Sequence, residues 1–212
     1  LSCKTIAVSG TSGKSTVTAM IYHVLDCAGL SPSLITGAGL VSLERLGKIG
    51  NAVAGNGEWL VIEADESDGS LVRYFPDIGI ILNVDKDHKE ISELEEIFQK
   101  FSENIKERNG VLFANGDNLL AAKYVSNRLN LFGKAQSYGV QGVDYRVEGF
   151  SSCFRVRCAG ELVRFCLPLP GKHNMENALA ATSAALKVGI NLHDIAEALS
   201  TFPGIYRRHQ IL

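Results

Sequence analysis

The sequence predicts an α/β fold with three layers: a mostly parallel, P-loop-type sheet flanked by helices, with a small antiparallel β region. Three observations predict it. Short apolar runs of strand length alternate with longer segments whose apolar residues recur at helical spacing. A glycine-rich turn joins the first run to the first helical segment. Between about residues 137 and 169 the pattern changes to short alternating segments separated by turn residues, which is typical of antiparallel strands.

Four apolar runs are the expected strands of the parallel sheet. Residues 59–63 and 78–82 are continuously apolar, which suits central strands because helices cover both of their faces. Shorter runs at residues 5–9 and 111–114 are expected to join them. All four lie before residue 115.

Two long helices are predicted in the same part of the chain. Residues 14–28 carry apolar side chains at helical spacing, and Gly29 is well placed to cap the C-terminus of this helix. Residues 92–108 are amphipathic, and Ser92 with Glu95 forms a capping-box pattern at the start. A further helix is expected over residues 118–129.

The second half combines an antiparallel region with two more helices. Its expected strands, residues 145–150, 154–158 and 162–167, form either a ribbon or a small second sheet. The helical pattern then returns at residues 174–188 and 192–199, with Asn191 as the expected N-cap of the last helix. Pro203 and Gly204 end that helix.

Composition excludes several classes of function. The 212 residues carry a formal net charge of −2 and no basic stripe, so nucleic acid is not an expected partner. The longest apolar runs are too short to span a bilayer, and no membrane association is expected. The start of the chain lacks the apolar core of a signal peptide and runs directly into a strand, as if an earlier domain had been cut away.

The five cysteines carry no metal-binding or disulfide signature. Their number is odd and no two have CxxC spacing, so neither a zinc site nor a disulfide framework is expected. Free thiols in a reducing cytoplasm are the simple interpretation.

The strongest motif is a phosphate-binding loop between the first strand and the first helix. It reads Gly10-Thr11-Ser12-Gly13-Lys14-Ser15-Thr16. Glycines let backbone N–H groups turn toward phosphate oxygens, and a helix N-terminus attracts anions. We expect Lys14 to reach the β- and γ-phosphates of ATP and the Ser15 hydroxyl to bind Mg²⁺. Two residues separate the glycines where the usual P-loop has four, so an ordinary glycine-rich turn is the alternative.

The shortened loop resembles that of the Mur ligases and the related folylpolyglutamate synthases, and later segments resemble further Mur ligase motifs in the same order. These segments are Glu63-Ala64-Asp65-Glu66-Ser67-Asp68, Asn83-Val84-Asp85-Lys86-Asp87-His88, Gly171-Lys172-His173-Asn174-Met175-Glu176-Asn177-Ala178 and Pro203-Gly204-Ile205-Tyr206-Arg207-Arg208-His209-Gln210. The acidic segment is typical of the branch that adds L-alanine to UDP-N-acetylmuramic acid.

The resemblance implies an ATP-dependent carboxylate–amine ligase of cell-wall precursor synthesis. In this family a substrate carboxylate attacks the γ-phosphate of ATP, and an incoming amine displaces phosphate from the resulting acyl-phosphate. The implied Mg²⁺ ligands are Ser15, Glu63 and His88, with Asp65 behind them. On residue type alone, Glu63 could belong to a solvated acidic turn and His88 to a surface loop.

The resemblance also implies the remaining nucleotide contacts. His173, Asn174 and Asn177 match residues that line the adenine pocket, although simple helix capping by Asn174 is the plainer alternative. Arg208 matches an arginine that reaches the ATP phosphates when the domains close, and its plainer alternative is an exposed charge. The implied catalytic set is Lys14, Glu63, His88 and Arg208.

The family has three domains, and this sequence resembles the second. Residues 1–203 match the ATP-binding domain, with the β ribbon at about 137–169, and residues 204–212 match a hinge to a C-terminal domain. UDP-N-acetylmuramic acid and an amino acid or peptide would be bound with the help of the two other domains. The isolated chain is expected not to ligate.

Some residues depart from the pattern of the L-alanine branch. Ser12 stands where histidine is usual, and His209 replaces an aromatic residue. The ligase that recycles a cell-wall tripeptide is therefore the alternative within the family. A P-loop kinase and a nucleotide-binding regulatory module are the alternatives outside it.

Overall fold

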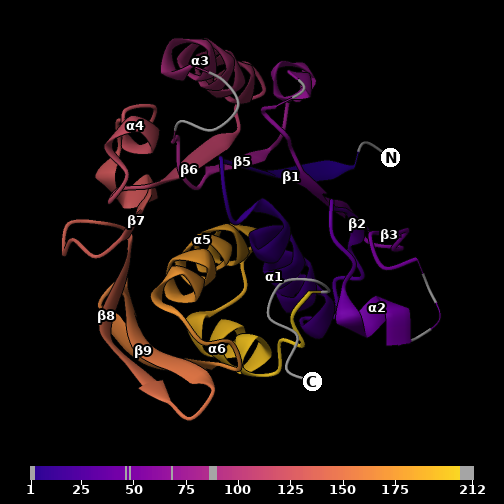
Figure 1. Ribbon diagram of the computed structural model, residues 1–212, viewed down its shortest axis with the longest axis vertical. Coiled ribbons are helices and arrows are strands. Elements are labelled where there is room, and N and C mark those ends of the chain that lie inside the picture. The colour runs from indigo at the N-terminus through magenta and orange to yellow at the C-terminus, as the bar shows by residue number, and fades with distance from the viewer. Residues whose placement is uncertain (1–2, 46, 48, 68, 86–89, 206–212) are drawn as a thin grey trace.

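A computed structural model describes residues 3–45, 47, 49–67, 69–85 and 90–205. Its centre is one ten-stranded sheet in the order β10-β9-β8-β7-β6-β5-β1-β4-β2-β3 (Figure 1). The strands are β1 (Lys4–Ser9), β2 (Ser33–Ile35), β3 (Ala52–Val53), β4 (Trp59–Glu63), β5 (Ile78–Ile81), β6 (Val111–Asn115), β7 (Leu131–Gly133), β8 (Val140–Glu148), β9 (Ser151–Cys158) and β10 (Glu161–Leu167). The helices are α1 (Lys14–Cys27), α2 (Val41–Arg45), α3 (Ile91–Glu107), α4 (Leu119–Ala122), α5 (Lys172–Val188) and α6 (Leu192–Ser200).

In the order of the sheet from β8 to β2, each strand pairs in parallel with the next, as the sequence predicts, whereas β3 pairs antiparallel with β2. Strand β1 lies between β4 and β5, with Val8 opposite Glu63 and Ser9 opposite Ile81. The carboxyl ends of these three strands therefore meet at one edge of the sheet. The loop after β1, the acidic segment after β4 and the segment after β5 all leave from this edge.

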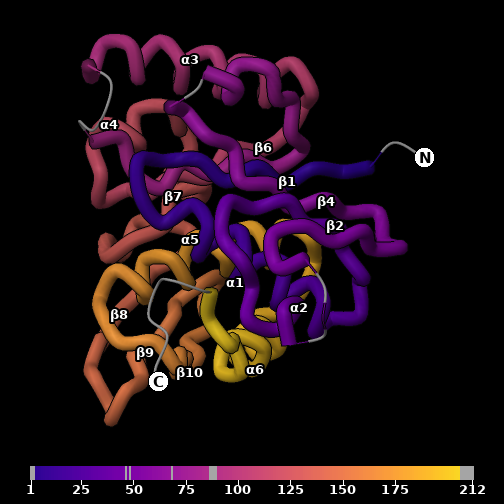
Figure 2. The backbone as a smooth tube through the Cα atoms, turned by 45° about the vertical axis from the view of Figure 1, so that its right-hand side comes forward, coloured from indigo at the N-terminus to yellow at the C-terminus, as the bar shows by residue number. Residues whose placement is uncertain are grey.

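Helices cover both faces of the sheet, which gives the three predicted layers (Figures 1 and 2). Alternate residues of β1 show this division: Ile6 and Val8 pack with α1, α5 and α6, whereas Ala7 packs with α3. Helix α3 buries Phe98 and Phe101 completely. The core is thus two apolar clusters separated by the sheet, and the α/β prediction is confirmed.

Two local end signals of the helices are confirmed. Gly29 has a φ of +75°, and the backbone N–H groups of Gly29 and Leu30 donate to the carbonyls of Asp26 and Leu25, which is a Schellman cap. The Asn191 side chain accepts a hydrogen bond from the Asp194 N–H at 2.9 Å and caps α6. Both caps involve residues close in sequence.

The capping box predicted for the amphipathic helix is wrong. Helix α3 begins one residue earlier, at Ile91, with Glu90 as an N-cap whose side chain makes no capping hydrogen bond. Helix ends are commonly displaced by a residue from their sequence signals.

The helix predicted over residues 118–129 is also wrong. Only Leu119–Ala122 is helical, and a 3₁₀ turn follows at Arg128–Asn130. Asn118 caps the short helix by accepting from the Ala121 N–H, and the Asn127 side chain accepts from the Leu129 N–H and starts the separate 3₁₀ turn. Side chains that bond to nearby N–H groups start new turns and so divide a longer helix.

The antiparallel region is a ribbon that continues the main sheet and is not a second sheet. Strand β8 pairs in parallel with β7 and antiparallel with β9, which pairs with β10. Asp144 has a φ of +55° at a register shift between Val143 and Arg146, which is a bulge that bends β8. The ribbon reaches along α5 and α6 (Figure 1).

Two of the five cysteines are paired, so the expectation that all are free is wrong. Cys153 and Cys166 lie directly opposite each other on β9 and β10 and form a disulfide. Cys3, Cys27 and Cys158 are free. The pairing depends on the register of the ribbon, which cysteine spacing does not reveal.

Among the described residues, no helix is both long and apolar enough to cross a membrane.

Candidate functional site

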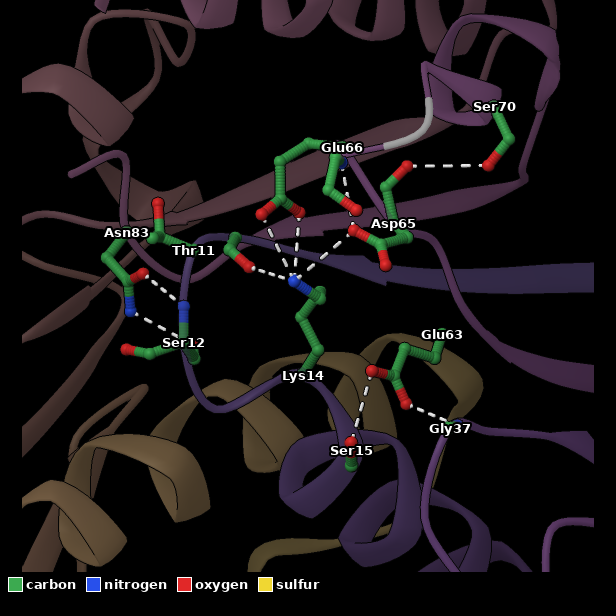
Figure 3. Close-up of polar contacts among 12 residues, drawn as sticks. Thr11, Ser12, Lys14, Ser15, Gly37, Glu63, Asp65, Glu66, Ser70 and Asn83 are labelled. Atoms are coloured by element: carbon green, nitrogen blue, oxygen red, sulfur yellow. Dashed lines mark hydrogen bonds and ion pairs between the residues drawn. The ribbon is translucent and has the colours of Figure 1, made fainter. Parts of the chain in front are cut away.

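The glycine-rich loop is fixed to the end of β5 by Asn83 (Figure 3). The Asn83 carbonyl accepts from the Thr11 N–H at 3.1 Å, and its side-chain Oδ1 accepts from the Ser12 N–H at 2.8 Å. The side-chain amide of Asn83 also donates to the Ser12 carbonyl at 3.1 Å. Asn83 therefore holds the loop on both sides of Ser12, and these two backbone donors point to Asn83.

The remaining donors of the motif belong to the first turn of α1. The N-cap of α1 is Gly13, which has a φ of +88° and no side chain to accept from the turn. Unpaired N–H groups and the helix dipole make such a terminus an anion site. Both Ser15 and Thr16 of this turn are buried.

The two expected metal ligands in the described part of the chain lie side by side. The Ser15 hydroxyl donates to Glu63 Oε1 at 3.1 Å (Figure 3). The other Glu63 oxygen accepts from the Thr36 hydroxyl at 2.9 Å and from the Gly37 N–H at 2.7 Å. Glu63 ends β4 and Ser15 lies in the first turn of α1, so the parallel pairing of β1 and β4 brings them together. Thr36 and Gly37 belong to no motif that sequence analysis identified, so these two contacts of Glu63 were not predicted.

The Lys14 ammonium lies among oxygen atoms (Figure 3). It donates to the Gly10 carbonyl at 2.9 Å and to both oxygens of Glu66, at 3.1 and 3.0 Å. Asp65 lies farther away, with Oδ1 3.7 Å from the Lys14 nitrogen. Glu66 is only 5% exposed, although its segment reads as a solvated acidic turn. The signal that identifies Glu66 is the position of its segment directly after a buried strand.

A cavity of about 280 Å³ joins the loop to the start of α5. Ser12, Gly13 and Thr16 line it on one side, and His173, Asn174 and Asn177 line it on the other. The structure thus brings together two sets of residues that are about 160 positions apart in the sequence. Leu82 and Phe132 add apolar walls, which suit a flat aromatic ring.

Asn174 shapes this cavity and does not cap the helix, so the capping alternative is wrong. The N-cap of α5 is Gly171. The buried Asn174 side chain donates to the Pro170 carbonyl at 2.8 Å, and its Oδ1 accepts from the Asn177 amide at 3.3 Å. These contacts fix the two amides against the loop.

Two predicted site residues, His88 and Arg208, lie outside the described residues. The described segment that leads to His88 is attached to the loop. The Asp85 N–H donates to the Thr11 hydroxyl at 3.0 Å, and that hydroxyl donates to the Asp85 carbonyl at 3.1 Å. Asp85, the last described residue before His88, therefore lies beside the glycine-rich loop.

The chain is similar to known proteins over nearly its whole length. The family described as the Mur ligase middle domain matches residues 8–185. A UDP-N-acetylmuramate–L-alanine ligase of Syntrophomonas wolfei is 38% identical over 98% of this chain and 46% of its own length. The enzyme of the same name from Rhizobium meliloti is 35% identical over 96% of this chain and 45% of its own length. The chain thus spans about half the length of the curated relatives that it matches.

Solved structures show the same fold. The UDP-N-acetylmuramate–alanine ligase of Thermotoga maritima superposes with a TM-score of 0.84 at 29% identity, over 97% of this chain and 46% of the other. The UDP-N-acetylmuramate:L-alanyl-γ-D-glutamyl-meso-diaminopimelate ligase of Neisseria meningitides gives 0.82 at 25% identity, over 97% and 68%.

Proposed function

The chain belongs to the Mur ligase family, and from that membership we propose that it is the ATP-binding domain, residues 1–203, of a ligase that joins L-alanine to UDP-N-acetylmuramic acid. The observation that carries the proposal is the arrangement of Lys14, Ser15 and Glu63 at the helix terminus beside the cavity. The names of the relatives supply the substrates. Residues 204–212 are the proposed hinge to a further domain.

The described residues fit ATP with Mg²⁺. Neighbouring oxygens in the octahedral shell of Mg²⁺ are about 3 Å apart, and Ser15 Oγ and Glu63 Oε1 are separated by 3.1 Å. Both are hard oxygen ligands, and they would hold the ion. The first turn of α1 would bind phosphate, and the cavity would accept the adenine between the loop and α5. We propose His88 as a further metal ligand and Arg208 as a phosphate contact, on the motif alone.

This arrangement suits phosphoryl transfer, which depends mainly on position and charge neutralisation. Bound Mg²⁺ supplies charge neutralisation at the phosphates. Lys14 adds a positive charge that the Gly10 carbonyl holds at the mouth of the loop. Asn83 fixes the loop backbone at Ser12, two residues before Lys14. The chain thus positions the γ-phosphate for attack by a carboxylate that another domain would present.

A second candidate is the recycling ligase that attaches a whole tripeptide. The Neisseria structure supports this candidate. It superposes on this chain with a TM-score of 0.82, close to the 0.84 of the Thermotoga L-alanine ligase. The amine-binding residues of the family lie in the third domain, so this chain alone does not distinguish the two.

The test measures phosphate release from MgATP by the full-length protein that carries this chain. UDP-N-acetylmuramic acid is held constant while L-alanine, other amino acids and the cell-wall tripeptide are offered in turn. Release with L-alanine alone supports the proposal, and release with the tripeptide alone assigns the protein to recycling. Release with none of them refutes the ligase assignment.

Two controls define what this chain contributes. Lys14→Ala in the full-length protein is expected to abolish phosphate release, whereas a regulatory module would only bind nucleotide less tightly. The isolated 212-residue chain is expected to bind ATP without ligating, because the substrate carboxylate and amine are held elsewhere. Ligation by the isolated chain would contradict the proposal that other domains hold the substrate carboxylate and the amine.

A further inference from the structure

Glu66 is a buried carboxylate beside the phosphate site. It is 5% exposed, and both of its oxygens accept from the Lys14 ammonium, at 3.1 and 3.0 Å (Figure 3). Among the described residues, the other charged neighbour of this ammonium is Asp65, which is about half exposed and lies 3.7 Å away. The closest contact between charges in the site is therefore Lys14 with Glu66.

We propose that Glu66 is a positioning residue that keeps the Lys14 ammonium in place throughout catalysis. Lys14 would then donate a further hydrogen bond to a phosphate oxygen of bound ATP without leaving Glu66. This inference rests on the proposed function, because it names how the phosphate-binding lysine is held.

The number of donors on an ammonium supports the proposal. Lys14 has three N–H groups. One N–H donates to the Gly10 carbonyl, and a second donates to the two oxygens of Glu66. A lysine side chain is flexible and has many rotamers, and anchoring at two points removes most of that freedom before the nucleotide arrives. The third N–H, with Asp65 Oδ1 3.7 Å from the nitrogen, would donate to a phosphate oxygen of bound ATP.

Burial explains why the contact should persist when nucleotide binds. A carboxylate that is nine-tenths buried is strongly destabilised if it loses its cation. Moving Lys14 fully onto the phosphates would leave Glu66 in that state. Sharing the ammonium between Glu66 and a phosphate avoids this cost. Lys14 is thus expected to bridge the two anions.

The charge of Glu66 gives the proposal a kinetic signature. A carboxylate near a polyphosphate repels it, so removing the charge should leave ATP binding unchanged or make it tighter. Removing the anchor should slow the chemical step, because small displacements of a catalytic group cost up to about 100-fold in rate. A merely structural role would instead lower stability and weaken binding together.

The experiment compares kcat and the KM for ATP in full-length Glu66→Gln and wild type, with UDP-N-acetylmuramic acid and L-alanine. We expect kcat to fall about 10- to 100-fold with an equal or lower KM. Glu66→Asp keeps the charge on a shorter side chain and should retain more of kcat than Glu66→Gln. An unchanged kcat in Glu66→Gln, or a lower kcat with a higher KM and a lower Tm, overturns the proposal.

The matched control is Glu58→Gln. Glu58 pairs with Lys4 at 3.1 Å on the surface, so this variant makes the same chemical change to an exposed lysine–glutamate pair. Its kcat and KM should equal those of wild type. An equal fall in kcat in Glu58→Gln and Glu66→Gln would show a general effect of removing a negative charge. It would overturn the positioning role of Glu66.

A second measurement does not depend on the acceptor substrates. A crystal structure of the full-length protein with Mg²⁺ and a non-hydrolysable ATP analogue should show Lys14 Nζ bonded to both Glu66 and a phosphate oxygen. A Lys14 Nζ that has left Glu66 for the phosphates overturns the proposal. If wild type releases no phosphate with the substrates named, the proposed function falls, while this contact still decides the role of Glu66.

Discussion

Gly13→Ala changes the residue at which the glycine-rich loop ends and α1 begins, and this residue also lines the cavity. Gly13 has a φ of +88°, where an alanine costs about 1–2 kcal/mol. The added Cβ would also lie 2.8 Å from Asn177 Oδ1 and 3.2 Å from Leu82 Cδ1. The Asn177 amide would have to move, and this displacement is expected to break its hydrogen bond to Asn174 Oδ1 at 3.3 Å. Losing that hydrogen bond costs about 1 kcal/mol more.

Two separate losses are therefore expected. The free energy of unfolding should fall by about 2–3 kcal/mol, the sum of the backbone strain and the hydrogen bond. The affinity for MgATP should also fall, because the lost Asn177–Asn174 hydrogen bond lies in the wall of the cavity. A loss of about 1 kcal/mol there corresponds to at least about a fivefold weaker affinity. Urea denaturation measures the first loss, and calorimetric titration of the full-length protein with MgATP measures the second.

Gly29→Ala is the matched control. Gly29 has a φ of +75°, and no atom lies within 4 Å of its added Cβ. It ends the same helix on which the site stands, so this variant should carry the backbone strain alone and bind MgATP as wild type does. Wild-type affinity in Gly13→Ala would refute the reasoning that places the nucleotide against Gly13 and Asn177.

Three further predictions follow from other parts of the molecule. Burial lowers the pKa of His23, whose Nε2 donates to the Ala198 carbonyl at 2.9 Å. Because the fold favours the neutral ring, the free energy of unfolding should fall as the pH drops from about 6.5 toward the lowered pKa, and His23→Gln should flatten this dependence in urea unfolding. With Cys153 and Cys166 paired, a thiol reagent applied to the denatured, unreduced protein should modify three cysteines, and modification of five would exclude the disulfide. Phe98→Ala removes a side chain that is 0% exposed and should cost about 3–5 kcal/mol in urea denaturation, whereas a cost below about 1 kcal/mol would contradict its place in the core.

Features that depend on neighbouring residues could be predicted from the sequence. Runs of apolar residues located β4 and β5 because buried parallel strands need no polar face. Gly29 and Asn191 marked helix ends because each cap is formed within a few residues. The glycine-rich loop was found in the same way, because strand, turn and helix follow one another along the chain. Family resemblance added the expected partners of that loop.

Only the tertiary structure decided which distant groups meet. The pairing of β1 with β4 and β5 places Glu63 beside Ser15 and Asn83 beside Ser12, and no local pattern encodes that pairing. The segment that holds Glu66 reads as a solvated acidic turn, and its burial against Lys14 results from the edge of the sheet at which both segments arrive. The disulfide likewise follows from the register of the ribbon. The sequence by itself determined the fold class and the phosphate loop, because their signals are local. The contacts that complete the site join residues far apart in the chain, so they exist only once the sheet has formed.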